Sequence, residues 1–213
     1  MIEPRQLVPA LVRLVLAWAF LSVAGYAYGR ELAAVLVPLI AGVVEFTAPE
    51  LRVFLSIVER EGEDMIRMTA VLRQPLAVAP GVTLPANTEL PSATNVVHTL
   101  VPLVILFSLL FAYPARSLTE RFYQALIGVM VGALVVVLTA PFVLLGQVEI
   151  FYQELAAQAG VQRWEPLLLT WMIAMESGGR WVLGLVGAGL AAYLAAWMAR
   201  PPGYATRTGP MPG

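Results

Sequence analysis

The sequence predicts an α-helical integral membrane protein with about four transmembrane helices and a small extracytoplasmic cap made of a β-hairpin and amphipathic helices. Of its 213 residues, 59% are hydrophobic and only 13% are charged, against ~25% charged residues in ordinary globular domains. Residues 122–148 carry no charge, and a helix of about 20 apolar residues crosses the hydrocarbon of a bilayer. We therefore expect a single membrane domain over residues 1–199, followed by a flexible cytoplasmic tail over 200–213.

Four apolar segments are expected to span the membrane, at about residues 7–28, 96–114, 122–146 and 181–199. The first is expected to be an uncleaved signal anchor, because Arg13 can extend its charge to the headgroups. The GYAYG sequence that follows also lacks the small-x-small site of a cleaved signal peptide. The third is expected to begin after Ser117, which forms the S-x-x-E pattern of a capping box with Glu120.

The two segments between these spans, 30–95 and 147–180, are expected on the outer side. Residues 32–44 are apolar but too short to cross, which favours a re-entrant or interfacial helix. Its buried seam is expected to consist of residues at helical spacing, namely Leu32, Leu36, Leu39 and Val43. Residues 166–175 are also too short, and we expect them on the membrane surface with Trp164 and Trp171 as interfacial aromatics.

A β-hairpin is predicted around the acidic turn Glu61-Gly62-Glu63-Asp64. Its flanks, 53–58 and 65–72, are rich in apolar and β-branched residues, although the first flank also fits a helix. An isolated hairpin is only marginally stable, so we expect it to pack on the outer helices and leave the acidic turn free for a partner. The side chains expected to face these helices are Phe54, Ile57, Ile66 or Met68.

The distribution of arginine predicts that both termini are cytoplasmic, in the inner membrane of a bacterium. Basic residues in short loops mark the inner side of a membrane protein, and Arg116 and Arg121 lie in the short loop between the second and third spans. On this assignment the only acidic residues on the inner side are Glu3 and Glu120. The basic residues there are more numerous: Arg5, Arg13, Arg116, Arg121, Arg200 and Arg207.

Small residues recur at helical spacing in the last two spans. The third contains Gly128 and Gly132, and the fourth repeats a small residue at every fourth position: Gly184, Ala188, Ala192 and Ala196. Such stripes let helices approach closely in lipid, where apolar burial gives no driving force for association. We expect packing within this chain, with packing against a partner as the alternative.

The polar candidates near the outer membrane boundary are His98, Glu176 and Arg180. Glu176 and Arg180 have the i, i+4 spacing of a helical ion pair, although Gly178 and Gly179 favour a break there. A polar residue at the headgroup level is the simplest interpretation of His98. The alternative is an intramembrane hydrolase in which His98 would activate Ser177, but no G-x-S-x-G context surrounds that serine.

Composition excludes several kinds of chemistry. The chain has no Cys and no Lys, which excludes disulfides, thiolate metal sites, a catalytic thiol and a lysine Schiff base. Its net charge of −1 does not indicate nucleic-acid binding. Glycine-rich phosphate loops and H-E-x-x-H motifs are missing, so we expect no cofactor and no metal.

The order of these segments resembles that of the exosortase H-associated membrane protein family. The similarity covers approximately residues 7–199 and is carried by EREGEDMIRMTAVL, TNVVHTLVPLVILFSLLFAYPARS and RFYQALIGVMVGALVVVLTAPFVLLGQVEIFYQELAAQAG. Exosortases process sorting signals with Cys, Arg and His, whereas this chain has no Cys. The resemblance therefore implies an accessory partner of such an enzyme and carries over no catalytic residue.

The expected function is that of a non-catalytic accessory protein in an exosortase-type protein-sorting system, in contact with the lipid bilayer and with such an enzyme. One alternative is a small transporter or channel component, although ionisable residues inside the spans, which such proteins need, are missing apart from Arg13. The other alternative is the hydrolase using Ser177 and His98.

Overall fold

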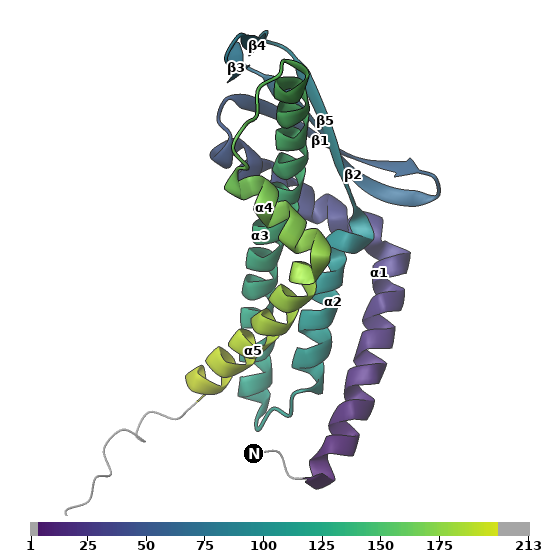
Figure 1. The fold of residues 1–213 in the computed structure, drawn as a ribbon. Helices are drawn as coiled ribbons and strands as arrows, with labels where there is room; N and C mark the ends of the chain where they lie inside the picture. The colour runs from purple at the N-terminus through teal and green to yellow at the C-terminus, as the bar shows by residue number, and fades with distance from the viewer. Residues whose placement is uncertain (1–3, 200–213) are drawn as a thin grey trace, which may run out of the picture.

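The computed structural model describes residues 4–199, as a bundle of helices with a small antiparallel sheet at one end (Figure 1). Three helical segments are long and apolar enough to cross a membrane: Val8–Ala27, Leu118–Gln158 and Leu167–Met198. A fourth apolar helix, α2 (Val96–Ala112), is shorter. The predicted helical class with membrane contact is therefore confirmed. The predicted hairpin is present as part of a small sheet.

Helix α1 (Pro4–Thr47) joins the expected first span and the expected short helix into one bent element. The bend lies at Tyr28, whose backbone is not helical (φ −122°, ψ 18°). The seam expected for residues 32–44 is wrong, because Leu32 and Leu39 are exposed while Ala33, Ile40 and Val44 are buried. The buried face is shifted by one residue from the expected one, and at its start α1 packs closely on α2, since a Cβ at Gly29 would lie only 3.4 Å from Val96.

Helix α3 (Leu118–Gln158) contains the expected third span and continues well beyond it. Its 41 residues correspond to about 60 Å at 1.5 Å per residue, roughly twice the hydrocarbon thickness. The Ser117 half of the capping box is confirmed, since the Glu120 N–H donates to Ser117 Oγ (3.1 Å). The Glu120 carboxylate accepts from the N–H of Arg116 (2.7 Å), one residue before the N-cap. The first part of the expected outer segment 147–180 is therefore a continuation of the same helix.

The expected surface helix at 166–175 packs alongside α3. It consists of α4 (Leu167–Ala174), which runs through a π-helical turn, η1 (Met175–Gly179), into α5 (Arg180–Met198). The Trp171 indole N–H donates to the Leu138 carbonyl (2.8 Å) of α3. Gly146 of α3 leaves no room for a side chain beside Met172, since an added Cβ would lie 2.6 Å away. Trp164, in contrast, is 95% exposed.

The hairpin prediction is confirmed and its ambiguity resolved, since both flanks are strands: β1 (Leu51–Arg60) and β2 (Glu63–Leu72). The turn is tighter than expected. Only Glu61 and Gly62 form it, with φ of 57° and 82°, the two positive values of a type I′ turn that suits the twist of a hairpin. Glu63 and Asp64 belong to β2.

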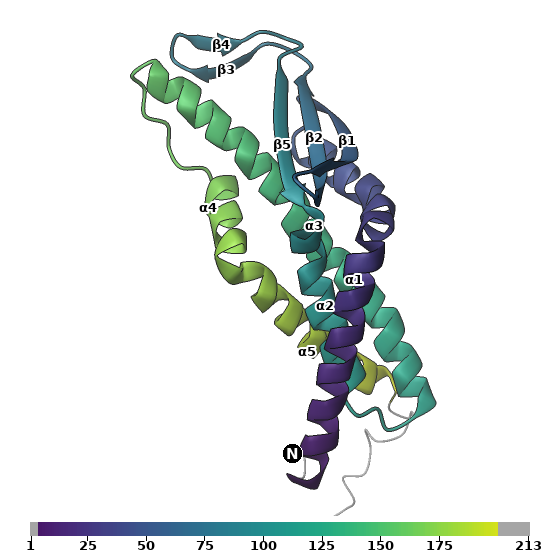
Figure 2. The ribbon, with the colours of Figure 1, turned by 90° about the vertical axis from the view of Figure 1, so that its right-hand side faces the viewer.

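The sheet has a third strand that the sequence did not reveal, β5 (Glu89–Asn95), in the order β1-β2-β5. Two short strands, β3 (Leu76–Ala79) and β4 (Val82–Leu84), form a separate ribbon farther from the bundle (Figure 2). The sequence pattern does not predict β5, because Pro91 and the polar residues around it are uncommon in strands. Proline is tolerated there because β5 is an edge strand.

One face of the sheet covers the second half of α1 and the outer half of α3. Ile66 and Met68 are fully buried in this core and Ile57 packs at its margin, as expected. The expectation for Phe54 is wrong, because this side chain is 57% exposed. Alternate residues of a strand point to opposite faces, and the register places Leu51, Val53 and Leu55 on the inner face instead.

Candidate functional site

Glycines in α3 and α5 let both helices pack closely on α2. A Cβ at Gly128 would lie 2.7 Å from Leu110, and one at Gly132 would lie 3.1 Å from Leu103. A Cβ at Gly184 would lie 2.8 Å from the Pro102 carbonyl oxygen. These glycines therefore serve packing inside the chain.

The fourth-residue pattern did not reveal Gly187, which is equally restricted. An added Cβ there would lie 3.0 Å from Leu106 of α2 and 3.1 Å from Val131 of α3. The signal that could have found it is the three-residue step from Gly184, since helix neighbours recur at both three and four positions.

The remaining small residues of the stripe line a cavity of about 720 Å³, which we call the inner groove. Ala188 and Ala192 are buried and Ala196 is half-buried, and Gly189 forms part of the same wall. Leu11 and Leu14 of α1 line the opposite side, with Leu109 and Tyr113 of α2 between them. Figure 1 shows α1 and α5 on either side of α2.

The α1 wall of the inner groove packs against α2 but is largely exposed. The most apolar window of Val8–Ala27 contains no buried residue, and Leu11, Val15 and Trp18 are each more than half exposed. Arg116 and the buried Glu120 lie at the polar end of the groove. The arrangement is an apolar groove that opens sideways, as expected of a surface that meets lipid or another helix.

The acidic residues of the hairpin end are in different environments. Glu61 is exposed at the turn, 3.6 Å from Arg60. Glu63 accepts a hydrogen bond from the Asn95 side chain (2.6 Å), and Asp64 lies 3.6 Å from Arg30 of α1. Asp64 therefore connects the hairpin to α1 and Glu63 connects it to the end of β5, while Glu61 has 84% of its side chain exposed.

His98, Glu176 and Arg180 line one cavity of about 320 Å³, which we call the outer cavity. They come from the start of α2, from η1 and from the start of α5, and apolar side chains complete the wall, among them Val101 and Trp181. The π-helical turn creates this arrangement, since Gly178 adopts φ +112°, which favours glycine. Such turns are frequent at functional sites.

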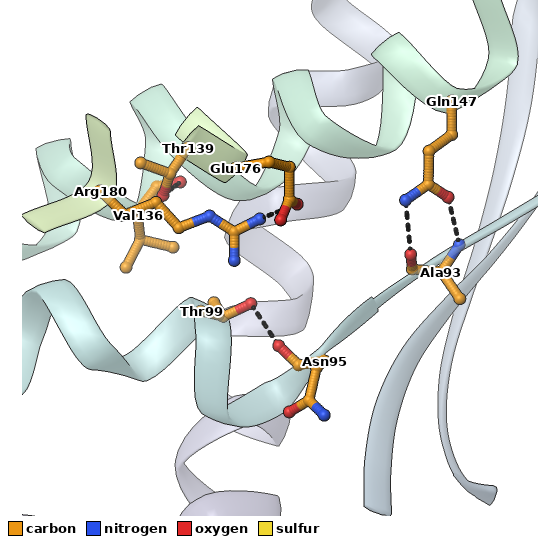
Figure 3. Close-up of polar contacts among 8 residues, drawn as sticks. All are labelled: Ala93, Asn95, Thr99, Val136, Thr139, Gln147, Glu176 and Arg180. Carbon is orange, nitrogen blue, oxygen red and sulfur yellow. Dashed lines mark hydrogen bonds and ion pairs between the residues drawn. The ribbon is translucent and has the colours of Figure 1, made fainter. Parts of the chain in front are cut away.

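Arg180 is only 6% exposed and forms an ion pair with Glu176 (Figure 3). The expected pair and the expected break are thus both present, because the π-helical turn bends the chain and still brings the two side chains together. The Nε atom of Arg180 has no hydrogen-bond partner within residues 4–199. A buried donor without a partner is costly, and Arg180 also lines the cavity, so its guanidinium is the group that an acceptor in the cavity would stabilise.

Ser177 is exposed and is not part of the outer-cavity wall, whereas His98 is. The residues of the hydrolase alternative therefore do not share this cavity. Across the described part of the chain, no group of three or more His, Asp or Glu side chains could hold a metal ion.

The outer edge of β5 is closed by a side chain of α3. The Gln147 amide donates to the Ala93 carbonyl (2.8 Å) and accepts from the Ala93 N–H (3.0 Å), as Figure 3 shows. This pair imitates a neighbouring strand and protects an edge that could otherwise recruit another chain.

The chemistry of the inner groove and the outer cavity is the basis on which a function can be proposed. Comparison of the chain with protein-family models, curated proteins and solved structures found no match.

Proposed function

We propose that the chain is a non-catalytic accessory protein of an exosortase-type sorting system in the bacterial inner membrane. In this proposal α2 crosses the membrane together with the three longer segments, both termini are cytoplasmic, and the inner groove holds a transmembrane helix of the partner enzyme. The observation that carries the proposal is the inner groove, in which small residues of α5 face the largely exposed first half of α1.

The inner groove suits a helix because of its small residues. Gly189 has no atom within 4 Å of the position where its Cβ would lie, and Ala188, Ala192 and Ala196 add only methyl groups to the same wall. Helices associate in lipid through close packing over such positions. The exposed first half of α1 would gain its missing contacts when a partner helix binds.

Site-directed photo-cross-linking tests the proposal. The chain has no Cys, so a single cysteine at Leu11 can carry a benzophenone probe into the inner groove with no second labelling site in this chain. In cells of the native host, the expected product is an adduct containing a transmembrane peptide of an exosortase-like enzyme, identified by mass spectrometry.

Val12 supplies the matched control, since it is also exposed on α1 but does not line the inner groove. A probe at Val12 should give lipid adducts only. The substitution Gly189→Phe should fill the groove and abolish the Leu11 adduct while leaving the melting temperature unchanged. Lipid adducts alone at Leu11, or an enzyme adduct that persists in Gly189→Phe, would contradict the proposal.

A further inference from the structure

The outer cavity combines two opposite charges that are only partly satisfied. Arg180 is buried, and its Nε has no partner within the described residues. Its partner Glu176 is less buried, with 44% of the side chain exposed, and only Oε1 of its carboxylate contacts Arg180. A ligand that fits must offer an acceptor to the guanidinium, and a cationic group would suit the exposed carboxylate.

The outer cavity lies level with the end of the candidate span in α1. The apolar part of α1 ends at Ala27, and a Cβ at the nearby Gly29 would lie 3.4 Å from Val96, at the start of α2. Val97 and His98, which follow directly, line the cavity. Arg180 is likewise the first residue of α5. In the proposed topology, α2 and α5 cross the membrane from these residues, which places the charged groups at the depth of lipid phosphates.

An apolar crevice adjoins the charged groups. Trp181 belongs both to the outer cavity and to a second cavity of about 350 Å³. The second cavity is lined by Trp18 of α1, Ile105 of α2 and Leu185 of α5, and it reaches toward the inner groove. A charged head with an apolar extension along the helices has the form of a phospholipid and differs from that of a small soluble anion.

We infer that the outer cavity binds a phospholipid whose headgroup contains both a phosphodiester and an ammonium group, as phosphatidylethanolamine does. The Arg180 guanidinium donates to a phosphate oxygen, with His98 beside the same oxygens. The ammonium meets the free side of the Glu176 carboxylate, and one acyl chain lies in the crevice beside Trp18. The headgroup site shares no lining residue with the inner groove and does not depend on the proposed partner, whereas the crevice shares Leu14, Leu109 and Leu185 with the groove.

Native mass spectrometry of the purified full chain in detergent tests the inference, with added phosphatidylethanolamine, phosphatidylglycerol or free phosphoethanolamine. The wild type should retain phosphatidylethanolamine best. Glu176→Gln should remove the preference over phosphatidylglycerol, since only the ammonium contact is lost. Arg180→Gln should weaken both lipids about tenfold or more, the effect of losing a charge-assisted hydrogen bond.

Two further variants make the result decisive. Arg180→Gln also breaks an internal ion pair. His98 is exposed and lies outside that pair, so His98→Ala gives an independent measurement. It should reduce the amount of bound lipid several-fold. Arg60→Gln, at a highly exposed arginine of the hairpin, should change nothing. Equal lipid retention in wild type, Arg180→Gln and His98→Ala would overturn the inference. Tighter binding of free phosphoethanolamine than of the lipid would do so too.

Discussion

Gly184 and Gly189 show how differently two glycines of one helix can be used. Both lie in α5, but a Cβ at Gly184 would meet a backbone carbonyl at 2.8 Å, whereas Gly189 has free space around it. We expect Gly184→Ala to destabilise the protein by about 1–3 kcal/mol, because the backbone of α2 cannot move aside as a side chain could. Thermal unfolding in detergent measures the effect.

Gly189→Ala is the matched control for this prediction. It should be neutral or should stabilise the protein by up to about 1 kcal/mol, because alanine restricts the unfolded chain more than glycine does. Equal melting temperatures for the two variants would mean that α5 does not approach α2 as closely as described.

At the scale of elements, the sheet depends on contacts from the helices at its edges. Gln147→Ala removes both hydrogen bonds to Ala93, at an expected cost of about 1–3 kcal/mol, since each bond contributes roughly 0.5–1.5 kcal/mol. Amide hydrogen exchange should accelerate in β5 and remain slow in β2, the central strand. Gln158→Ala, at the exposed end of α3, is the control and should leave exchange in β5 unchanged.

The short β3-β4 ribbon gives a second comparison within the same exchange experiment. Its strands have three or four residues and pair only with each other, whereas β2 is paired on both sides and buries Ile66 and Met68. Amides of β3 and β4 should therefore exchange faster than those of β2. Uniformly rapid exchange over residues 51–95 would contradict the cap as described.

At the scale of the whole molecule, one end of the bundle carries the sheet and the other carries the α2-α3 loop (Figure 1). Reporter fusions should place Ser117 in the cytoplasm and both Gly62 and Gly160 outside, because basic residues in a short loop, here Arg116 and Arg121, favour the inner side. A fusion at Gly203 tests the C-terminal tail, which lies outside the described residues. An external signal at Ser117 would reverse the topology and place the cap in the cytoplasm.

The sequence by itself determined the features that depend on local physics. Uncharged apolar length predicts the long helices, the Ser117 and Glu120 pair predicts the start of α3, and the acidic glycine turn predicts the hairpin. Each of these is decided by neighbouring residues, through hydrophobic burial, capping or backbone conformation. The short helix at 32–44 was also recognised, although not its union with the first span across the bend at Tyr28.

Only the tertiary structure decided which faces meet. A shift of one position exchanges the faces of a strand and rotates a helix by about 100°, and this is why Phe54 and the seam of residues 32–44 were predicted wrongly. The strand β5 depends on β2 and on Gln147, which lies far away along the chain. The outer cavity likewise forms only because a π-helical turn brings Glu176 and Arg180 beside His98, through contacts between segments that no local pattern records.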